Sequence, residues 1–209
     1  MLGDAILIQT PFQKENILID TGSPYNANRL LKNLKEKGVY KIDHLIITHL
    51  DLDHVGNVKS LSQEFMIDQI HFDHEDIITK ELTLYSLNSH SFDNRNDNSL
   101  VYYLNIEGFS YLFCADISAK VESKILRSYD LNADVLKLGH HGSNTSSSEY
   151  LLSHLNPLVA IASTSGAYNH PSIEVLQRLK RYDIKNYITK DDGTISFYHS
   201  FLPWIFIQS

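Results

Sequence analysis

Short apolar runs separated by polar turns dominate this 209-residue chain, and they constrain its fold more than any other feature. Runs of about four to eight apolar residues are typical of buried β-strands. Strand-like runs follow one another near the start of the chain and alternate with helix-like segments further on. This order predicts an α/β sandwich, with mixed sheets inside and helices outside.

The expected strands cover residues 5–10, 16–22, 42–49, 66–72, 81–87, 99–116, 133–139, 157–164 and 184–190, with final strands in the 193–209 tail. The first two form a hairpin around Pro11, and the 99–116 segment holds two strands joined at Glu107-Gly108. The expected helices cover residues 26–38, about 56–63, 119–129, 146–155 and 171–182. The length fits one domain spanning residues 1–209.

The composition argues against several classes of protein. A formal net charge of −7 disfavours a broad basic surface for nucleic acid, although a local basic groove stays possible. The single cysteine, Cys114, excludes an internal disulfide and a cysteine-only metal site, and its place in a predicted strand indicates inert core. No stretch approaches the roughly 18 apolar residues of a membrane span. The chain is interpreted either as a complete soluble protein or as a fragment, since Gly3-Asp4 leads directly into a strand without a leader.

Residues 48–57, THLDLDHVGN, place two imidazoles and two carboxylates directly after an apolar run. A loop at a strand end can turn all four toward one ion, and these residue types are metal ligands: His49, Asp51, Asp53 and His54. Asp53 alone would also suit a different role, as the cap of the helix expected from about Gly56. Capping requires neither histidine, so the pattern favours a metal site.

The segment HLDLDH resembles the HxHxDH signature of the metallo-β-lactamase superfamily, with Asp51 in place of the usual second histidine. The segments ILIDTG, YLFCAD and LKLGHHGS are similar to further motifs of this family and follow in the same order. Together with GDAILIQ and NDNSLV, they resemble more closely the lactamase-like domains of ComEC-type DNA-uptake proteins, and also phosphorylcholine esterase domains. The resemblance extends over about residues 3–192 and implies an αββα metallo-β-lactamase-type sandwich.

The resemblance also implies two divalent metal ions, Mn²⁺ or Zn²⁺, that clamp a phosphoryl oxygen and activate water. In this interpretation the first ion is held by His49 and Asp51, the second by Asp53, His54 and His141, and Asp116 bridges both. Asp20, in ILIDTG, corresponds to a carboxylate that anchors the ligands. An oxygen ligand at Asp51 shifts the preference from Zn²⁺ toward Mn²⁺.

One departure from the family concerns the first ion. The family places a histidine about four residues before the serine that opens the strand leading to the bridging carboxylate. That serine is Ser99 here, and residues 95–98 read Arg-Asn-Asp-Asn. His90 lies nearby at a different spacing, as a ligand or as an exposed loop residue. Asn96 could supply a carbonyl oxygen instead, or this stretch could only form a turn.

His140 and His141 are adjacent in GHHGS and are expected to point in different directions. The family ligand is a histidine followed by glycine, so His141 is the expected ligand. His140 is then expected to contact phosphate or to protonate the leaving group, assisted by the Ser143 hydroxyl, although one of the pair could be structural. His170, before a predicted helix, could donate a hydrogen bond to phosphate or serve only in the loop. The expected catalytic residues are thus Asp53, His140 and His170.

The resemblance implies a metal-dependent phosphodiester hydrolase, specifically a nuclease acting on DNA during competence-type uptake. The basic residues nearest the motifs in sequence are Arg95, Lys120 and Lys137. A fragment of a membrane-embedded uptake protein would lie at the outer face of the cytoplasmic membrane, with no membrane span of its own. Two alternatives stay open: a small-substrate phosphodiesterase such as a phosphorylcholine esterase, which needs an aromatic box for a quaternary ammonium, and a non-catalytic domain that binds DNA or a partner.

Overall fold

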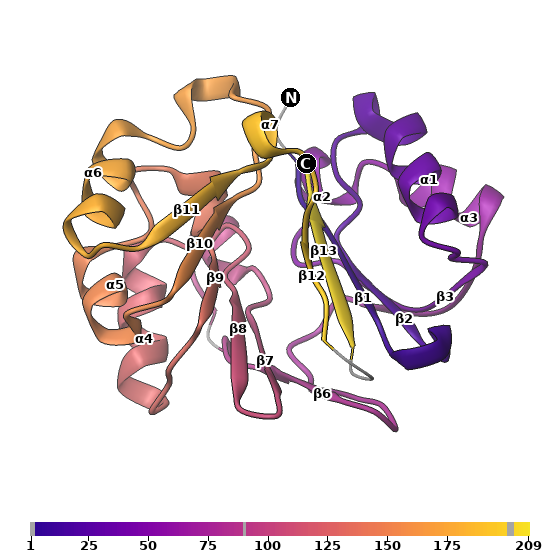
Figure 1. Ribbon diagram of the computed structural model, residues 1–209, viewed down its shortest axis with the longest axis horizontal. Helices are drawn as coiled ribbons and strands as arrows, with labels where there is room; N and C mark the ends of the chain where they lie inside the picture. Colours follow the sequence, from indigo (N-terminus) through magenta and orange to yellow (C-terminus); the bar gives the residue numbers. More distant parts are fainter. Residues whose placement is uncertain (1–2, 90, 200–202) are drawn as a thin grey trace.

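The computed structural model describes residues 3–89, 91–199 and 203–209 of the chain. Two β-sheets face each other, and helices cover the outer face of each sheet (Figure 1). The αββα sandwich with two mixed sheets predicted from the sequence is therefore confirmed. No helix within the described ranges is long and apolar enough to cross a membrane.

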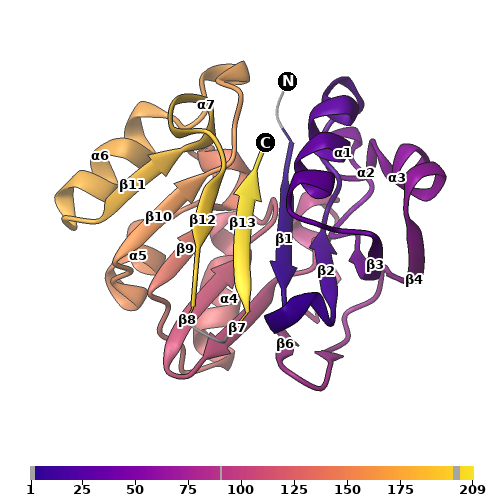
Figure 2. The ribbon, with the colours of Figure 1, turned by 45° about the vertical axis from the view of Figure 1, so that its right-hand side comes forward.

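Sheet A contains strands from both ends of the chain: β1 (Ala5–Gln9), β2 (Asn16–Ile19), β3 (Lys41–Ile46), β4 (Met66–His71), β12 (Ile195–Phe197) and β13 (Trp204–Gln208). Their order is β12-β13-β1-β2-β3-β4. Strand β1 runs antiparallel to β2 and β13, so the first and last strands lie side by side (Figure 2). Helices α1 (Ala27–Glu36) and α3 (Val58–Glu64) cover the outer face of this sheet.

Sheet B contains the middle of the chain: β5 (Ile77–Ile78), β6 (Thr83–Ser86), β7 (Tyr102–Ile106), β8 (Phe109–Phe113), β9 (Val135–Lys137), β10 (Val159–Ala162) and β11 (Lys185–Ile188). Their order is β11-β10-β9-β8-β7-β6-β5. Strands β8 to β11 run parallel to one another. Helices α4 (Ala119–Ser128), α5 (Glu149–Leu155) and α6 (Ile173–Arg181) cover the outer face (Figure 1).

Alternation of side chains along the strands divides the apolar residues among three layers. In β1, Ile6 belongs to the core between the sheets and Leu7 to the core under α1. In β8, Tyr111 faces the core between the sheets and Leu112 the core under α4 to α6. Strands covered on both faces need apolar side chains at nearly every position, which explains why they appear as continuous apolar runs in the sequence.

The helices bury one stripe each, because side chains four positions apart share a face. In α1 this stripe is Leu30 and Leu34, and in α6 it is Val175 and Leu179. Burying one such side chain stabilises the fold by about 1.5–3 kcal/mol. The same stripes fix which face of each helix meets its sheet, and so fix where the connecting loops leave the sandwich.

The helix expected over about residues 56–63 is present as α3 (Val58–Glu64), but a shorter helix before it was not predicted. A short helix, α2 (Leu52–Val55), begins inside the metal motif, and α3 follows after a break. The chain is closely packed at this break, because a side chain at Gly56 would collide with the Leu52 carbonyl oxygen. Asn57, not Asp53, occupies the cap position of α3, so the capping role considered for Asp53 is wrong, whereas Asp51 stands at the cap position of α2.

Smaller differences concern strand ends. The strand expected through residue 190 stops at Ile188, where the short helix α7 (Thr189–Asp192) begins. Strand β5 was not predicted, because two apolar residues are too few to give a pattern. Cys114 lies just beyond β8 and is fully buried, as expected of core. His90 lies outside the described residues.

Candidate metal centre

Loops from both sheets meet at one place between them. Sheet A supplies Asp20 after β2, His49 after β3 and His54 on α2. Sheet B supplies Asp116 after β8 and His141 in η4 (Gly139–Gly142) after β9. The predicted ligands are therefore divided between the two sheets, and only the packing of the sandwich brings them together.

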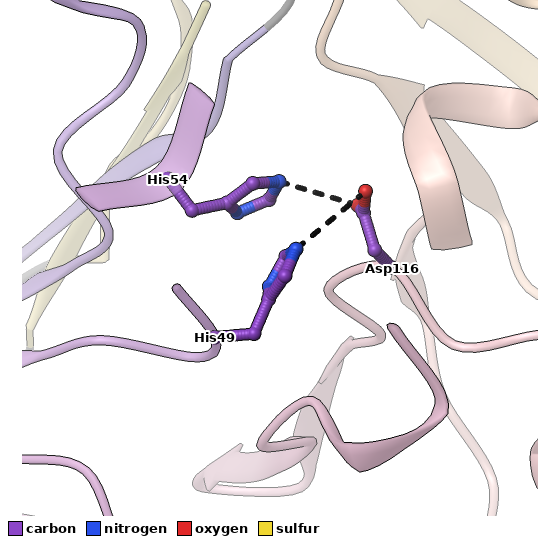
Figure 3. A group of neighbouring side chains, drawn as sticks. All are labelled: His49, His54 and Asp116. Carbon is purple, nitrogen blue, oxygen red and sulfur yellow. Dashed lines mark ion pairs between the residues drawn. The ribbon is translucent and has the colours of Figure 1, made fainter. Parts of the chain in front are cut away.

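His49, His54 and Asp116 form the first group of donors (Figure 3). His49 Nε2 lies 3.9 Å from Asp116 Oδ2, and His54 Nε2 lies 3.4 Å from Asp116 Oδ1. All three residues are buried, and the donor atoms they offer lie within 4.8 Å of one another. Imidazole nitrogen combined with carboxylate oxygen suits divalent zinc and manganese.

Asp53, His54 and His141 form a second group of donors. His141 Nε2 lies 3.4 Å from Asp53 Oδ2 and 3.6 Å from Asp116 Oδ2. Asp116 therefore faces both groups, one oxygen toward His54 and the other toward His49 and His141.

Several atoms at this place are buried and make no hydrogen bond within the described residues. They are His49 Nε2, His54 Nε2, His141 Nε2 and Asp116 Oδ1. A buried polar atom without a partner costs about 1–3 kcal/mol, and native folds rarely tolerate several together. A bound cation would give all of them a partner, so the residues present fit a metal centre.

His54 is held through its other ring nitrogen. Its Nδ1 lies 2.7 Å from Asp20 Oδ2, and both residues are buried. Asp20 in turn accepts hydrogen bonds from the Thr48 backbone N–H at 2.8 Å and from the Thr48 hydroxyl at 2.7 Å. This contact fixes the imidazole ring and leaves Nε2 as its free donor atom, an arrangement common around bound metals.

Asp51 is the most exposed of the predicted ligands and belongs to neither group of donors in the described chain. Its Oδ2 lies 3.8 Å from His49 Nε2, while its Oδ1 lies 2.9 Å from Arg95 Nη2. Arg95 comes from the segment in which the family has its middle histidine. Asn96 begins a turn of 3-10 helix, η3 (Asn96–Asn98). Its backbone carbonyl oxygen accepts hydrogen bonds from the backbone N–H and the hydroxyl of Ser99.

The two adjacent histidines have different surroundings. His141 is fully buried, whereas the His140 side chain is 33% exposed, with its Nε2 3.8 Å from Asp116 Oδ2. The His170 ring lies 5.9 Å from the His140 ring, on the outer side of the donors. The Ser143 hydroxyl pairs with the Thr145 hydroxyl at 3.0 Å.

Contact between the acids and the imidazoles shifts their titration. Burial lowers the pKa of His141, but Asp116 and Asp4 raise it to about 9. Burial likewise opposes ionisation of Asp116, yet His141 and His54 hold its pKa well below the usual range. Burial and the neighbouring His54 lower the pKa of His49. A metal ion would therefore displace protons from the imidazoles on binding.

Two buried residues of this site were missed in the sequence. The Asp4 side chain is 2% exposed and that of Lys137 is 0% exposed, and Lys137 Nζ lies 2.6 Å from Asp4 Oδ2. Asp4 Oδ1 lies 3.3 Å from His141 Nδ1. Lys137 was identified only as a basic residue near the motifs, and its burial excludes contact with a nucleic acid. The sequence did contain a signal for this buried pair. Lys137 lies within a predicted apolar strand, and a buried ammonium requires a carboxylate partner.

Comparison with known proteins agrees with this geometry. Residues 2–199 match the family model described as the metallo-beta-lactamase superfamily. ComE operon protein 3 of Bacillus subtilis (strain 168) is 28% identical over 93% of this chain and 31% of its own length. Competence protein ComA of Neisseria gonorrhoeae is 30% identical over 93% of this chain and 30% of its own length. These matches confirm the resemblance inferred from the motifs, and the chain spans about three tenths of the length of these relatives.

Solved structures share the fold at low identity. A protein of Parabacteroides distasonis ATCC 8503, solved as a candidate metal-dependent hydrolase, has a TM-score of 0.54 and 14% identity, covering 84% of this chain and 85% of its own. The CmlA β-hydroxylase E377D mutant has a TM-score of 0.55 and 12% identity, covering 96% of this chain and 53% of its own. At these identities the likeness concerns the fold alone.

Proposed function

This chain belongs to the metallo-beta-lactamase superfamily, and we propose that it is a metal-dependent phosphodiester hydrolase whose substrate is DNA. The observation that carries the proposal is the convergence of buried, unpaired nitrogen and oxygen donors from two sheets. DNA is supported by the relatives, which include a competence protein and, in Haemophilus influenzae, Recombination protein 2 at 31% identity. The longer protein to which such a domain would belong is, in this proposal, a membrane-embedded DNA-uptake protein.

We assign two divalent ions to the centre. Asp53, His54 and His141 would hold one, His49 and Asp51 would hold the other, and Asp116 would serve both. When bound, the ions would supply positive charge to a phosphoryl oxygen and activate water for attack on phosphorus. Asp51 can act as a ligand through Oδ2 while Oδ1 stays with Arg95. The carboxylate oxygens among these donors favour Mn²⁺ over Zn²⁺.

The remaining residues of the site act on the substrate in this proposal. His140, at the rim and partly exposed, donates a proton to the departing oxygen. His170, beside the His140 ring, holds a non-bridging phosphate oxygen by a hydrogen bond. Arg95 is exposed and adjacent to Asp51, so its guanidinium is placed to attract the phosphate backbone.

The alternative functions have less support. A phosphorylcholine esterase needs aromatic rings around the substrate ammonium. The Trp204 ring contacts Tyr198, and Trp204 pairs in register with Gln9 at one end of β1. Asp4, which lies beside the donors, is at the opposite end of β1. The tryptophan is therefore remote from the donors. A non-catalytic domain would have no need to keep several buried donor atoms unpaired.

The test is a nuclease assay on protein stripped of metal, with single-stranded and double-stranded DNA and added Mn²⁺, Zn²⁺ or Mg²⁺. We expect cleavage that requires metal, and its loss in Asp53→Ala with the circular dichroism spectrum unchanged. Asp130→Ala, an exposed carboxylate after α4, is the matched control and should retain activity. Nitrophenyl phosphorylcholine is the competing substrate. Wild-type cleavage by Asp53→Ala, or hydrolysis of the choline ester without cleavage of DNA, would contradict the proposal.

A further inference from the structure

We propose that Asp4 and Lys137 are positioning residues of the metal centre: a buried ion pair between the two sheets that places and polarises His141. The inference rests on the proposed function in one respect, which is that His141 binds metal. It assigns a role to GDAILIQ and to the lysine of LKLGHHGS, two segments that the ligand set leaves without one.

The ion pair joins the sheets where the ligands meet. Asp4 directly precedes β1 in sheet A, and Lys137 ends β9 in sheet B. Their 2.6 Å contact lies inside the sandwich, and Lys137 Nζ also donates to the Leu138 carbonyl oxygen at 3.1 Å. Because each sheet supplies part of the donor set, a link at this place sets the separation between the two parts.

Asp4 also touches segments that carry ligands. Its backbone N–H donates to the Asp53 carbonyl oxygen at 3.2 Å, on the α2 side of the site. Its Oδ1 lies 3.3 Å from His141 Nδ1, on the η4 side, at ion-pair distance and without a hydrogen bond among the described residues. The same His141 nitrogen donates to the Ser163 carbonyl oxygen at 2.9 Å, so Nδ1 carries the proton and Nε2 is left for metal.

The polar nature of the pair is informative. An apolar pair of similar volume would hold two sheets together at least as well, because burying two charges has a large desolvation cost. What an apolar pair lacks is a carboxylate charge beside Nδ1 of His141, which acts alongside the hydrogen bond to Ser163 to favour this ring orientation and to make Nε2 a stronger donor. Lys137 balances the charge of Asp4 in a site that already contains Asp20, Asp53 and Asp116.

The experiment separates support of the sheets from action on His141. Asp4→Asn, Lys137→Met and the double variant are made in the full chain. Unfolding midpoints are measured on stripped protein, and Mn²⁺ and Zn²⁺ dissociation constants by calorimetry. We expect both single variants to lose stability and the double variant to regain most of it, since neither charge is then left unpaired. We expect Asp4→Asn and the double variant to bind metal roughly 10–100-fold more weakly, the usual effect of removing such a partner.

Glu122→Gln is the matched control. Glu122 is a buried carboxylate on α4 that accepts hydrogen bonds from the backbone N–H groups of Ser147 and Ser148, and it touches none of the ligands assigned here. It should lose stability with metal affinity unchanged. A second readout, the ¹⁵N chemical shifts of the His141 ring in metal-free protein, should move in Asp4→Asn and stay the same in Glu122→Gln.

Each outcome has one meaning. Wild-type metal affinity in the double variant and in Asp4→Asn would overturn the positioning role and leave the proposed function standing. Failure of the wild-type protein to bind Mn²⁺ or Zn²⁺ would overturn both. If the double variant does not fold, Asp4→Asn, which preserves side-chain shape, decides the matter by metal affinity and by the ring shifts.

Discussion

His140 and His141 are neighbours in the chain, yet their side chains are 33% and 0% exposed. Their backbone φ angles of 46° and 54° lie in the left-handed region and turn the two rings apart, with an interplanar angle of 64°. One ring consequently faces the buried donors, and the other reaches solvent at the rim. The two roles proposed for them can be separated by experiment.

We predict that His141→Ala lowers metal affinity and that excess metal restores part of the rate. His140→Ala should keep metal affinity but lose roughly 10²–10⁴ in rate, the usual contribution of general acid–base catalysis. The His140→Ala defect should shrink on a nitrophenyl phosphodiester, because nitrophenolate departs without a proton. Metal content by mass spectrometry, beside rates on both substrates, checks this. Loss of metal by His140→Ala and not by His141→Ala would mean that the two roles are reversed.

The carboxylate of Asp51 bears on which metal ion the centre prefers. We predict that Mn²⁺ gives a higher saturating rate than Zn²⁺, because a carboxylate oxygen replaces an imidazole nitrogen. Asp51→His should narrow or reverse this difference by restoring a nitrogen donor beside His49. Metal titrations of the wild-type protein and the variant measure it, with Asp68→His, an exposed carboxylate on β4, as the control for an added histidine. A higher rate with Zn²⁺ in the wild-type protein would refute the prediction.

At the level of elements, the loop after β9 is shaped by close contact with the loop before α6. Gly142 has φ of 85°, and a side chain there would meet Pro171 Cβ at 2.6 Å. The Ser172 backbone N–H donates to the Gly142 carbonyl oxygen at 2.9 Å, so the two loops are joined. Through this contact, the segment that carries His170 supports the segment that carries His140 and His141.

We predict that Gly142→Ala destabilises the protein and weakens metal binding. Gly108→Ala is the control, because Gly108 has φ of 87° and open space where the new side chain would lie. Both variants pay the left-handed backbone penalty of about 1–2 kcal/mol, and Gly142→Ala adds about 1–3 kcal/mol of steric strain. Chemical denaturation and metal titration of both variants check this. Equal stability loss in the two, with unchanged metal affinity in Gly142→Ala, would show that the contact with Pro171 is unimportant.

At the scale of the whole molecule, the centre couples metal binding to stability. In metal-free protein the pKa of His141 is about 9, above its ordinary value of 6.5, so the folded state binds more protons than the unfolded state between these values. That contribution is fully present below pH 6.5 and is lost as the pH rises through 9. If metal occupies Nε2 of His141, the folded state holds no proton there. The stability of metal-bound protein then rises as the pH increases toward 6.5, the pKa of histidine in the unfolded state.

We therefore predict that the free energy of unfolding depends differently on pH in stripped protein and in protein saturated with metal. From pH 6.5 to 9, the free energy of unfolding of stripped protein should fall, by up to about 3 kcal/mol if His141 acts alone. Protein saturated with Mn²⁺ should show no such fall. Urea denaturation at several pH values, with and without metal, measures both curves. His141→Ala serves as the control and should reduce the fall in stripped protein; burial lowers the pKa of His54, but Asp116 and Asp20 raise it well above its ordinary value, so a part of the fall should remain. A parallel fall in both forms would contradict the coupling.

The sequence by itself determined the class of fold and predicted most of the histidines and aspartates that meet at the candidate metal centre. Continuous apolar runs predict strands buried on both faces, and this local pattern persists whatever the tertiary arrangement. The histidines and aspartates of THLDLDH could be recognised because they are close together in the sequence, so that their pattern is also local. The start of α2 inside that motif was missed, because a helix of four residues has too little periodicity to detect.

Only the tertiary structure decided how the centre is completed. Asp4 and Lys137 are 133 positions apart, so no local pattern relates them, and they meet because two sheets pack face to face. The same packing brings Asp51 to Arg95 and His170 beside His140. Contacts between distant segments depend on the relative placement of whole elements, which short-range spacing does not encode. The sequence thus predicted a metal centre of histidines and aspartates, and the packing of the two sheets fixed which side chains meet there.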